Sequence, residues 1–217
     1  MSRGYLALAG EGRAEIVVKK SKFIATAAPC QEEAEALRLI DRVRREFWDA
    51  THNVYAFVLG EHDEVARSSD DGEPAGTAGR PVLEVIKREQ VKYCTVVVTR
   101  YFGGTLLGAA GLVRAYGSAA REGLHAAGIV RKRLFREVRF VIDYPSLGRV
   151  QNLIAEQGFT VDRLSYAERV EMVIRIPSEM LPGFTRLMQD ALMGAFDPIV
   201  GEEKFGFDER PGTGSDG

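Results

Sequence analysis

Two glycine-rich segments hold most of the residues that could carry chemistry. The first segment covers residues 70–81, and its charged residues are Asp70, Asp71, Glu73 and Arg80. The second segment covers residues 100–116, and its residues of interest are Arg100, Gly103, Gly104 and Arg114. Glycine at this density costs backbone entropy and marks tight turns or the close approach of another group. We therefore expect function to reside in these two segments.

The second segment has the pattern of a strand, a glycine-rich turn and a helix. Free N–H groups at such a helix N-terminus bind anions, although the segment matches neither the Walker A loop nor the dinucleotide fingerprint. Arg114 falls in the first turn of the expected helix, where the helix dipole disfavours a cation. Arg100 lies at the strand end beside the same loop. These two arginines indicate a negative partner, which is either an external phosphate or nucleic acid, or the acidic first segment.

The acidic segment has a metal interpretation and a structural one. Asp70, Asp71 and Glu73 carry the oxygen ligands that Mg²⁺ prefers, but their spacing is not that of an EF-hand. An acidic turn that caps the following helix or pairs with arginine is the favoured alternative. The sequence therefore predicts a structural latch or, at most, a weak metal site, and we expect no cofactor.

Catalytic signatures are sparse in this chain. No paired-histidine or cysteine–histidine set predicts zinc, and no serine or cysteine has the context of a nucleophile. His52 with Asp70 or Asp71 could act as an acid–base pair, but a hydrogen-bonded structural histidine is favoured. We assign no catalytic residue, and a role other than catalysis is the favoured expectation.

Three lysines surround an aromatic residue near the N-terminus: Lys19, Lys20 and Lys22 flank Phe23. This pattern fits nucleic-acid contact, with phosphates paired to the lysines and a base stacked on the ring. The favoured alternative is a solvated edge strand that lysines protect from association.

Periodicity predicts the elements that position these residues. In the first part of the chain the expected strands are 14–18, 23–25, 53–59, 65–67 and 93–99, and the expected helices are 32–48, 81–88 and 112–127. The run at 93–99 is β-branched and nearly continuous, which is typical of a strand covered on both faces.

The second part has its own rhythm of elements. The expected strands are 138–144, 160–166, 169–176 and 199–205. One expected helix follows a turn and possible N-cap at Pro145–Ser146, and a second expected helix covers 181–191. This β-α-β-β-α-β order is that of a ferredoxin-like unit. We place a domain boundary near residue 137, giving domains 1–137 and 138–208, and expect a disordered tail over 209–217 because it is rich in Gly, Ser and Asp.

Composition excludes several classes of protein. Apolar residues make up 45% and charged residues 28% of the 217 residues, as in soluble globular proteins. No apolar run reaches the roughly 20 residues that cross a bilayer, and the two separated cysteines fit a reducing compartment, so we expect a cytoplasmic protein without a membrane partner. The net charge is +3 up to Glu137 and −5 beyond it, which favours an anionic partner for the first part.

Four motifs in this order resemble the IMPACT/YigZ family. They are residues 21–25, 51–56, 70–81 and 100–116, and the resemblance covers roughly residues 15–128. It implies a bacterial two-domain α+β member: an N-terminal domain like the second domain of ribosomal protein S5, and a ferredoxin-like domain resembling the last domains of the translocase elongation factor.

The resemblance also implies a role in translation. Eukaryotic family members act in translational control by binding a large activator of an initiation-factor kinase, and bacterial members are proposed to bind nucleic acid. Our leading hypothesis is a translation-associated regulator that binds RNA, the ribosome or another phosphate-bearing ligand. Its expected site residues are Lys22, Arg80, Arg100, Gly103, Gly104 and Arg114. The alternatives are a protein-interaction module in stress or translational control, and an enzyme using His52 and the acidic segment.

Overall fold

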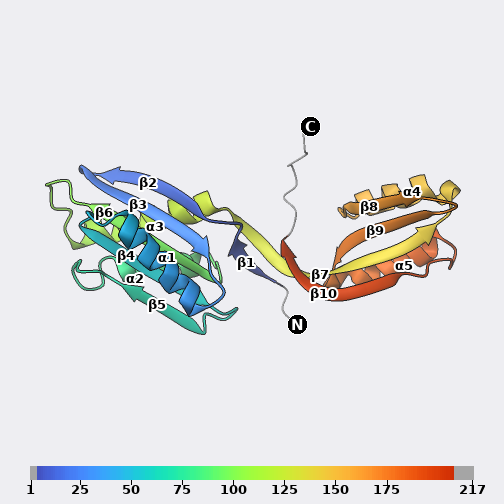
Figure 1. The fold of residues 1–217 in the computed structure, drawn as a ribbon, viewed down its shortest axis with the longest axis horizontal. Helices are drawn as coiled ribbons and strands as arrows, with labels where there is room; N and C mark the ends of the chain where they lie inside the picture. The colour runs from blue at the N-terminus through green and yellow to red at the C-terminus, as the bar shows by residue number, and fades with distance from the viewer. Residues whose placement is uncertain (1–3, 208–217) are drawn as a thin grey trace. The chain divides into compact units, whose positions relative to one another are not determined.

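The computed structural model describes residues 4–207 and divides them into two compact units (Figure 1). One unit covers Tyr5–Arg131, and the other contains Gly4 and the described chain from Lys132 onward. The described chain has five α-helices and two sheets, so it is a mixed α+β protein, as the sequence predicts. The tail expected over 209–217 lies outside the described residues.

The first unit is built on a five-stranded antiparallel sheet of order β2-β3-β6-β4-β5. Its strands are β2 (Gly12–Val18), β3 (Ser21–Pro29), β4 (His52–Leu59), β5 (Val65–Ser69) and β6 (Cys94–Tyr101). The register across the central strand places Arg100 of β6 opposite both Phe23 of β3 and His52 of β4. The sheet thereby brings together residues from three distant segments.

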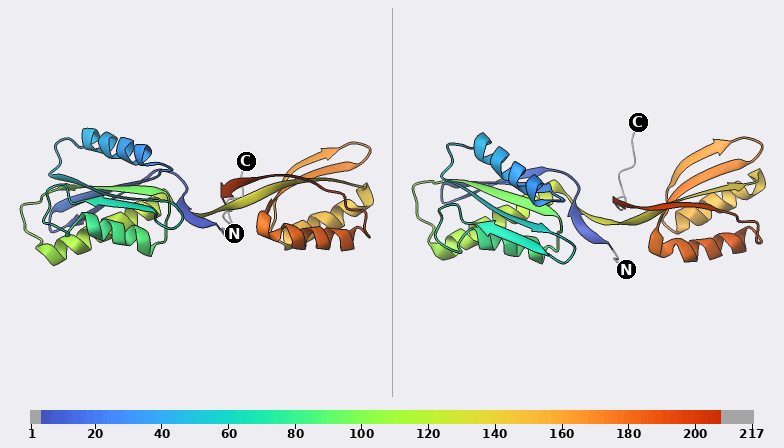
Figure 2. Two further views of the ribbon diagram at one scale, coloured as in Figure 1. Left: turned by 90° about the horizontal axis from the view of Figure 1, so that it is seen from below. Right: turned by 60° about the horizontal axis from the view of Figure 1, so that its bottom comes forward.

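Helices cover both faces of this sheet (Figure 2). The helices α2 (Gly79–Arg88) and α3 (Ala109–Ala127) share one hydrophobic core with the sheet, and α1 (Glu33–Glu46) shares another. Side chains of β6 alternate between the two cores, with Val96 and Val98 in the first and Val97 in the second. Burial on both faces explains the continuous β-branched run of this strand.

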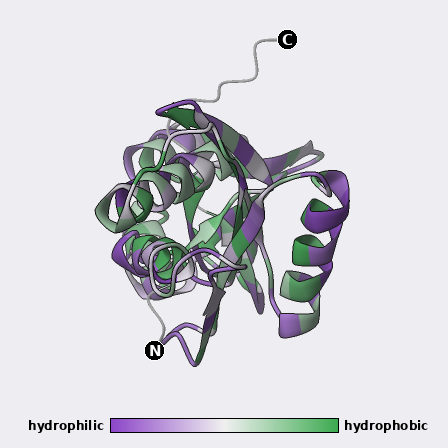
Figure 3. Cartoon of the chain, turned by 90° about the vertical axis from the view of Figure 1, so that its left-hand side faces the viewer, coloured by the Kyte–Doolittle hydropathy of each residue, from purple (hydrophilic) through white to green (hydrophobic). Residues whose placement is uncertain are grey.

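The second unit follows the element order that the sequence predicts. Its elements are β7 (Ile129–Ile142), α4 (Tyr144–Glu156), β8 (Val161–Tyr166), β9 (Val170–Pro177), a short 3₁₀ turn (Ser178–Met180), α5 (Leu181–Ala191) and β10 (Ile199–Phe207). The antiparallel strand order is β10-β7-β9-β8, and β1 (Tyr5–Leu8) also neighbours β7. The core of this unit contains Val138, Phe140 and Ile142 of β7. Figure 3 views the chain from the side of the first unit, whose helices carry both hydrophilic and hydrophobic stretches.

Two local features differ from expectation. The strand β7 starts at Ile129, so the units meet inside it, between Arg131 and Lys132, and residue 137 lies in the same strand. The expectation that Ser146 caps α4 is wrong, because Asp143 is the N-cap and its Oδ1 accepts the Ser146 N–H at 3.2 Å. None of the described helices is long and apolar enough to span a membrane.

Candidate functional site

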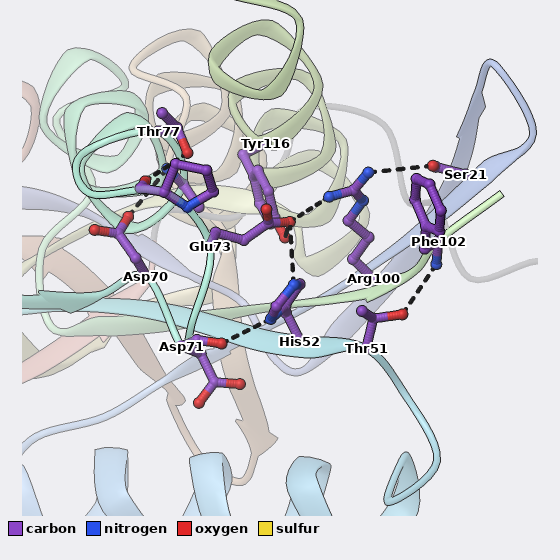
Figure 4. A network of polar contacts seen from close by, with 12 residues as sticks. Ser21, Thr51, His52, Asp70, Asp71, Glu73, Thr77, Arg100, Phe102 and Tyr116 are labelled. Atoms are coloured by element: carbon purple, nitrogen blue, oxygen red, sulfur yellow. Dashed lines mark hydrogen bonds and ion pairs between the residues drawn. The ribbon is translucent and has the colours of Figure 1, made fainter. Parts of the chain in front are cut away.

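The centre of the candidate site is a buried arginine on β6. Only 5% of Arg100 is exposed. Its Nη1 donates to Glu73 Oε1 at 2.6 Å, and its Cζ lies 5.5 Å from the ring centroids of both Phe23 and Phe102 (Figure 4). A buried charge is costly unless it is paired and hydrogen-bonded, and Glu73 of the acidic segment meets that need.

A tyrosine of α3 completes the pairing. The Tyr116 hydroxyl donates to the same Glu73 Oε1 at 2.7 Å. Burial raises the pKa of Tyr116, and the hydrogen bond to Glu73 raises it further, so the phenol remains a neutral donor. We name Glu73, Arg100 and Tyr116 the latch, because they connect the acidic segment, β6 and α3.

His52 lies beside the latch in a defined orientation. Its Nδ1 is 2.8 Å from the Asp71 carbonyl oxygen. Because a carbonyl only accepts, Nδ1 carries a hydrogen, and in the neutral ring Nε2 is then an acceptor. Nε2 faces Glu73 Oε1 across 3.9 Å. The expected acid–base pairing of His52 with an aspartate side chain is therefore not formed, because the contact is to the Asp71 backbone.

The other carboxylates of the acidic segment have separate structural partners. Asp70 accepts backbone N–H groups of Gly76, Ala78 and Gly79 at 2.8, 3.1 and 2.8 Å. Partial burial acts to raise the pKa of Asp70, but these three donors outweigh it and the pKa lies below its usual value. Asp70 thus ties down the turn that leads into α2.

Asp71 is held by a different pair of donors. Its Oδ1 accepts from Arg44 of α1 at 2.8 Å, and its Oδ2 accepts the Asn53 N–H at 2.7 Å. The three carboxylates of the segment therefore point to three different sets of partners. Within residues 4–207, no three His, Cys, Asp or Glu side chains gather in a group that could hold a metal ion.

A pocket of about 430 Å³ opens beside the latch and His52. Its polar lining includes Thr51, His52, Glu73 and Arg100, and its apolar lining includes Pro74, Phe102, Leu106, Leu107 and Leu112. We name it the Phe102 pocket, because this half-exposed ring comes from the glycine-rich loop that borders it. Thr51 Oγ1 accepts the Phe102 N–H at 3.0 Å and so fixes the start of that loop.

A second, smaller hollow of about 160 Å³ lies between α3 and the end of β2. Lys19, from the turn between β2 and β3, and Arg114 both line it, together with Leu107 and Ser118. We name it the basic cleft. Neither cation, nor the adjacent Lys20, has an ion-pair partner among residues 4–207.

The glycine loop packs directly on the lysine turn. A Cβ at Gly103 would lie 2.0 Å from the Lys20 backbone carbonyl carbon, so only glycine permits this approach. The Gly103 N–H donates to Ser21 Oγ at 3.1 Å, and Arg100 Nη2 donates to the same oxygen at 3.4 Å. Gly104 has φ of 76°, and a Cβ at this position would meet no atom within 4 Å.

The structure separates the two arginines of the second segment. Arg100 has an internal carboxylate partner, whereas Arg114 is exposed at the basic cleft. The helix α3 starts at Ala109 rather than at residue 112. Arg114 therefore lies in the second turn, and the helix-dipole argument fails because that effect is confined to the first turn.

Of the remaining sequence candidates, Lys22 and Arg80 have partners outside the latch, whereas Phe23 packs against it. Lys22 faces Glu15 at 3.7 Å and lies 5.4 Å from the Tyr101 ring centroid. Arg80 on α2 pairs with Glu84 at 3.0 Å. Phe23 is fully buried and meets Tyr116 edge-on, with ring centroids 5.1 Å apart. The expectation that Phe23 stacks on a base is therefore wrong.

Sequence reasoning missed several residues of the site. These are Ser21, Arg44, Thr51, Phe102 and Tyr116. Tyr116 lies on the apolar stripe of α3, so the sequence pattern indicates a core residue and gives no sign that its hydroxyl has a role. A buried tyrosine needs a hydrogen-bond partner, and this requirement could have identified Tyr116 as a candidate.

Comparison with known proteins yields matches to both units. A model of the Impact N-terminal domain matches residues 19–124, and a model of a domain of unknown function, DUF1949, matches residues 140–195. The chain is 40% identical over 202 residues to "IMPACT family member YvyE" of Bacillus subtilis, covering 93% of each protein. It is 33% identical over 188 residues to "IMPACT family member YigZ" of Escherichia coli, covering 86% of this chain and 92% of the relative.

A eukaryotic relative and a solved structure extend the comparison. "Protein IMPACT" of Rattus norvegicus is 35% identical over 100 residues, which are 44% of this chain and 31% of that protein. A solved structure titled "Crystal structure of an hypothetical protein" is 30% identical with a TM-score of 0.59, and the match covers 94% of this chain and 100% of that one.

Proposed function

The chain belongs to the IMPACT family, and on that premise we propose that it is a translation-associated regulator whose first unit binds RNA through the phosphate backbone. The observation that carries the proposal is the basic cleft, where Lys19 and Arg114 meet without an acidic neighbour in its lining. These cations come from segments that are far apart in the sequence, so the fold itself brings them together.

The geometry narrows the set of residues expected to contact phosphate. Arg100 is enclosed and paired with Glu73, so its role is to position the loop that borders the basic cleft. Lys22 follows the lysine turn on β3 and adds charge at the same end of the strand. Arg80 is committed to Glu84 on α2. Cations that neutralise phosphates release counterions, and this release makes binding favourable and dependent on salt.

The fold supports the same direction by analogy. The strand order β10-β7-β9-β8 of the second unit fits the proposed ferredoxin-like domain, and the helix-covered antiparallel sheet fits the proposed S5-like domain. The Impact N-terminal domain model matches residues 19–124, which lie in the first unit, so we assign the proposed binding function to that unit. Fold analogy supplies a direction, while the basic cleft supplies the residues.

The test is the salt dependence of RNA binding. We expect a short fluorescein-labelled single-stranded RNA to bind the full chain in fluorescence anisotropy, with affinity that falls steeply as salt rises. The double variant Lys19→Ala/Arg114→Ala should bind about tenfold more weakly and should lower the slope of log K against log salt by roughly 1.4.

The matched control is Arg80→Ala, which removes an exposed arginine outside the basic cleft and should leave both quantities unchanged. An absence of binding at low salt, or equal slopes for the double variant and the unsubstituted chain, would overturn the proposal. Recovery of a stoichiometric protein partner after nuclease treatment, without RNA affinity, would support a protein-interaction module instead.

A further inference from the structure

We propose that the Phe102 pocket accepts one unstacked nucleobase that carries an exocyclic amine, namely cytosine, adenine or guanine, and not uracil. The strand that supplies the base would place its phosphates at the basic cleft, so this inference deepens the proposed function and partly rests on it. The chemistry of the pocket, however, follows from its own lining and can be tested without any phosphate.

The pocket and the basic cleft are neighbours. Leu107 lines both of them. The start of α3 lies between them, with Ala109 and Leu112 lining the pocket and Gly111 and Arg114 lining the cleft. In a nucleotide the base and the phosphate are close to each other, as these two hollows are. One RNA strand that passes over the first turn of α3 can therefore place a base in the pocket and a phosphate at the cleft.

The apolar lining suits a flat ring. Phe102 is 46% exposed and Leu106 is 83% exposed, so both have surface available to a ligand. The Arg100 guanidinium lies over the Phe102 ring, and Thr51 holds the Phe102 backbone. Stacking on an aromatic side chain stabilises single-stranded nucleic acid and tolerates any base, because every base has a π-face.

The polar lining selects among the bases. In the neutral ring His52 Nε2 is an acceptor, and it lies 3.9 Å from Glu73 Oε1, which already accepts from Arg100 and Tyr116. A ligand group between these atoms meets acceptors on both sides, where a carbonyl is disfavoured and an exocyclic amine can donate to His52 Nε2. Cytosine, adenine and guanine each carry such an amine, whereas uracil carries none and presents a carbonyl at the position of the cytosine amine. Uracil would therefore set its lone pairs against two acceptors.

The first experiment titrates the full chain with cytidine and with uridine while following the His52 and Phe102 ring signals by NMR. Nucleosides carry no phosphate, so this measurement is independent of the basic cleft. We expect cytidine to shift both sets of signals with an affinity about tenfold above that of uridine. Equal affinities would overturn the selection by the amine, and the absence of any shift with either nucleoside would overturn the base pocket itself.

Variants locate the effect at the proposed atoms. His52→Ala should abolish the preference for cytidine, while His62→Ala, which alters an exposed histidine of the β4–β5 turn, should preserve it. Phe102→Ala should weaken the binding of both nucleosides. Phe102→Trp should retain their binding because it keeps an aromatic face. A preference that survives His52→Ala would contradict the hydrogen bond between the amine and His52.

A second experiment separates this proposal from the proposed function. Binding of an oligocytidine RNA is compared with binding of an abasic strand of the same length, which keeps the phosphates and lacks the bases. Lys19→Ala/Arg114→Ala should weaken the binding of both the oligocytidine RNA and the abasic strand. Phe102→Ala should weaken the binding of the oligocytidine RNA alone. Failure of the abasic strand to bind would count against the basic cleft alone, and equal binding of the two strands to the unsubstituted chain would count against the pocket.

Discussion

The two arginines of the glycine-rich segment have the same chemistry and opposite environments. Arg100 is enclosed by two aromatic rings and a carboxylate in the latch. Arg114 is exposed and shares the basic cleft with Lys19. Burial makes the partner of a charge obligatory, while exposure leaves a charge free for a ligand at little cost. The comparison fits a structural role for the latch and supports the recognition role that we propose for the cleft.

The largest expected effect comes from breaking the latch. Arg100→Met leaves Glu73 buried without its cation, and we expect the free energy of unfolding in urea to fall by roughly 3–5 kcal/mol. Arg114→Met is the matched control and should change stability by less than about 0.5 kcal/mol. Adding Glu73→Gln to Arg100→Met should restore part of the loss. Equal effects of the two arginine substitutions would erase the distinction between latch and cleft.

The next effect concerns the packing of the glycine loop on the lysine turn. Gly103→Ala introduces a Cβ that collides with the Lys20 backbone, and we expect a loss of about 2–3 kcal/mol in thermal or urea unfolding. Gly104→Ala places no atom against a neighbour but fixes alanine in the left-handed region, at a cost of about 1 kcal/mol. A smaller loss at position 103 than at position 104 would contradict the packing of loop on turn.

A smaller effect comes from the third member of the latch. Tyr116→Phe removes one donor from Glu73 while Arg100 remains in place. We expect stability to fall by about 1.5–2 kcal/mol, with RNA binding unchanged. A change in the salt slope without a change in stability would place Tyr116 in recognition instead of in the latch.

The smallest effect depends on pH. The folded-state pKa of Asp70 lies below its usual value of about 3.9. Its carboxylate therefore contributes stability above that usual value, and the contribution is lost as pH falls through the folded-state pKa. Asp70→Asn should cost about 1 kcal/mol at neutral pH. The difference from the unsubstituted chain should shrink as pH falls below about 4, and a constant difference across that range would contradict the assigned donors.

The strands and helices were largely predictable because each buries a periodic apolar face. The sequence predicts β6 from its β-branched run and α3 from its apolar spacing, and both are present. Their ends were less predictable, since α3 extends back to Ala109 through small residues that carry no amphipathic signal. The four-residue β1 was not predicted, because it is too short to show a period.

The site was predictable in location and not in detail. The glycine density identified both segments, but it gave no means to choose between an internal and an external partner for Arg100. That choice depends on strand register, which sets Arg100 opposite His52 and beside Glu73. The proximity of Lys19 and Arg114 depends on how the β2–β3 turn packs against α3. Local sequence patterns do not contain this information.

The lysine turn has a consequence for how far the protein can be stabilised. Lys19 and Lys20 have φ of 45° and 68°, where Asn-Gly is the preferred pair for a two-residue hairpin turn. A long side chain in this region stores strain of order 1 kcal/mol at each residue. Replacing the pair with Asn-Gly would relax the hairpin and at the same time remove two positive charges beside Arg114. Stability and the proposed affinity for RNA would thus compete at one turn, where the chain has charged residues instead of the pair that suits the backbone.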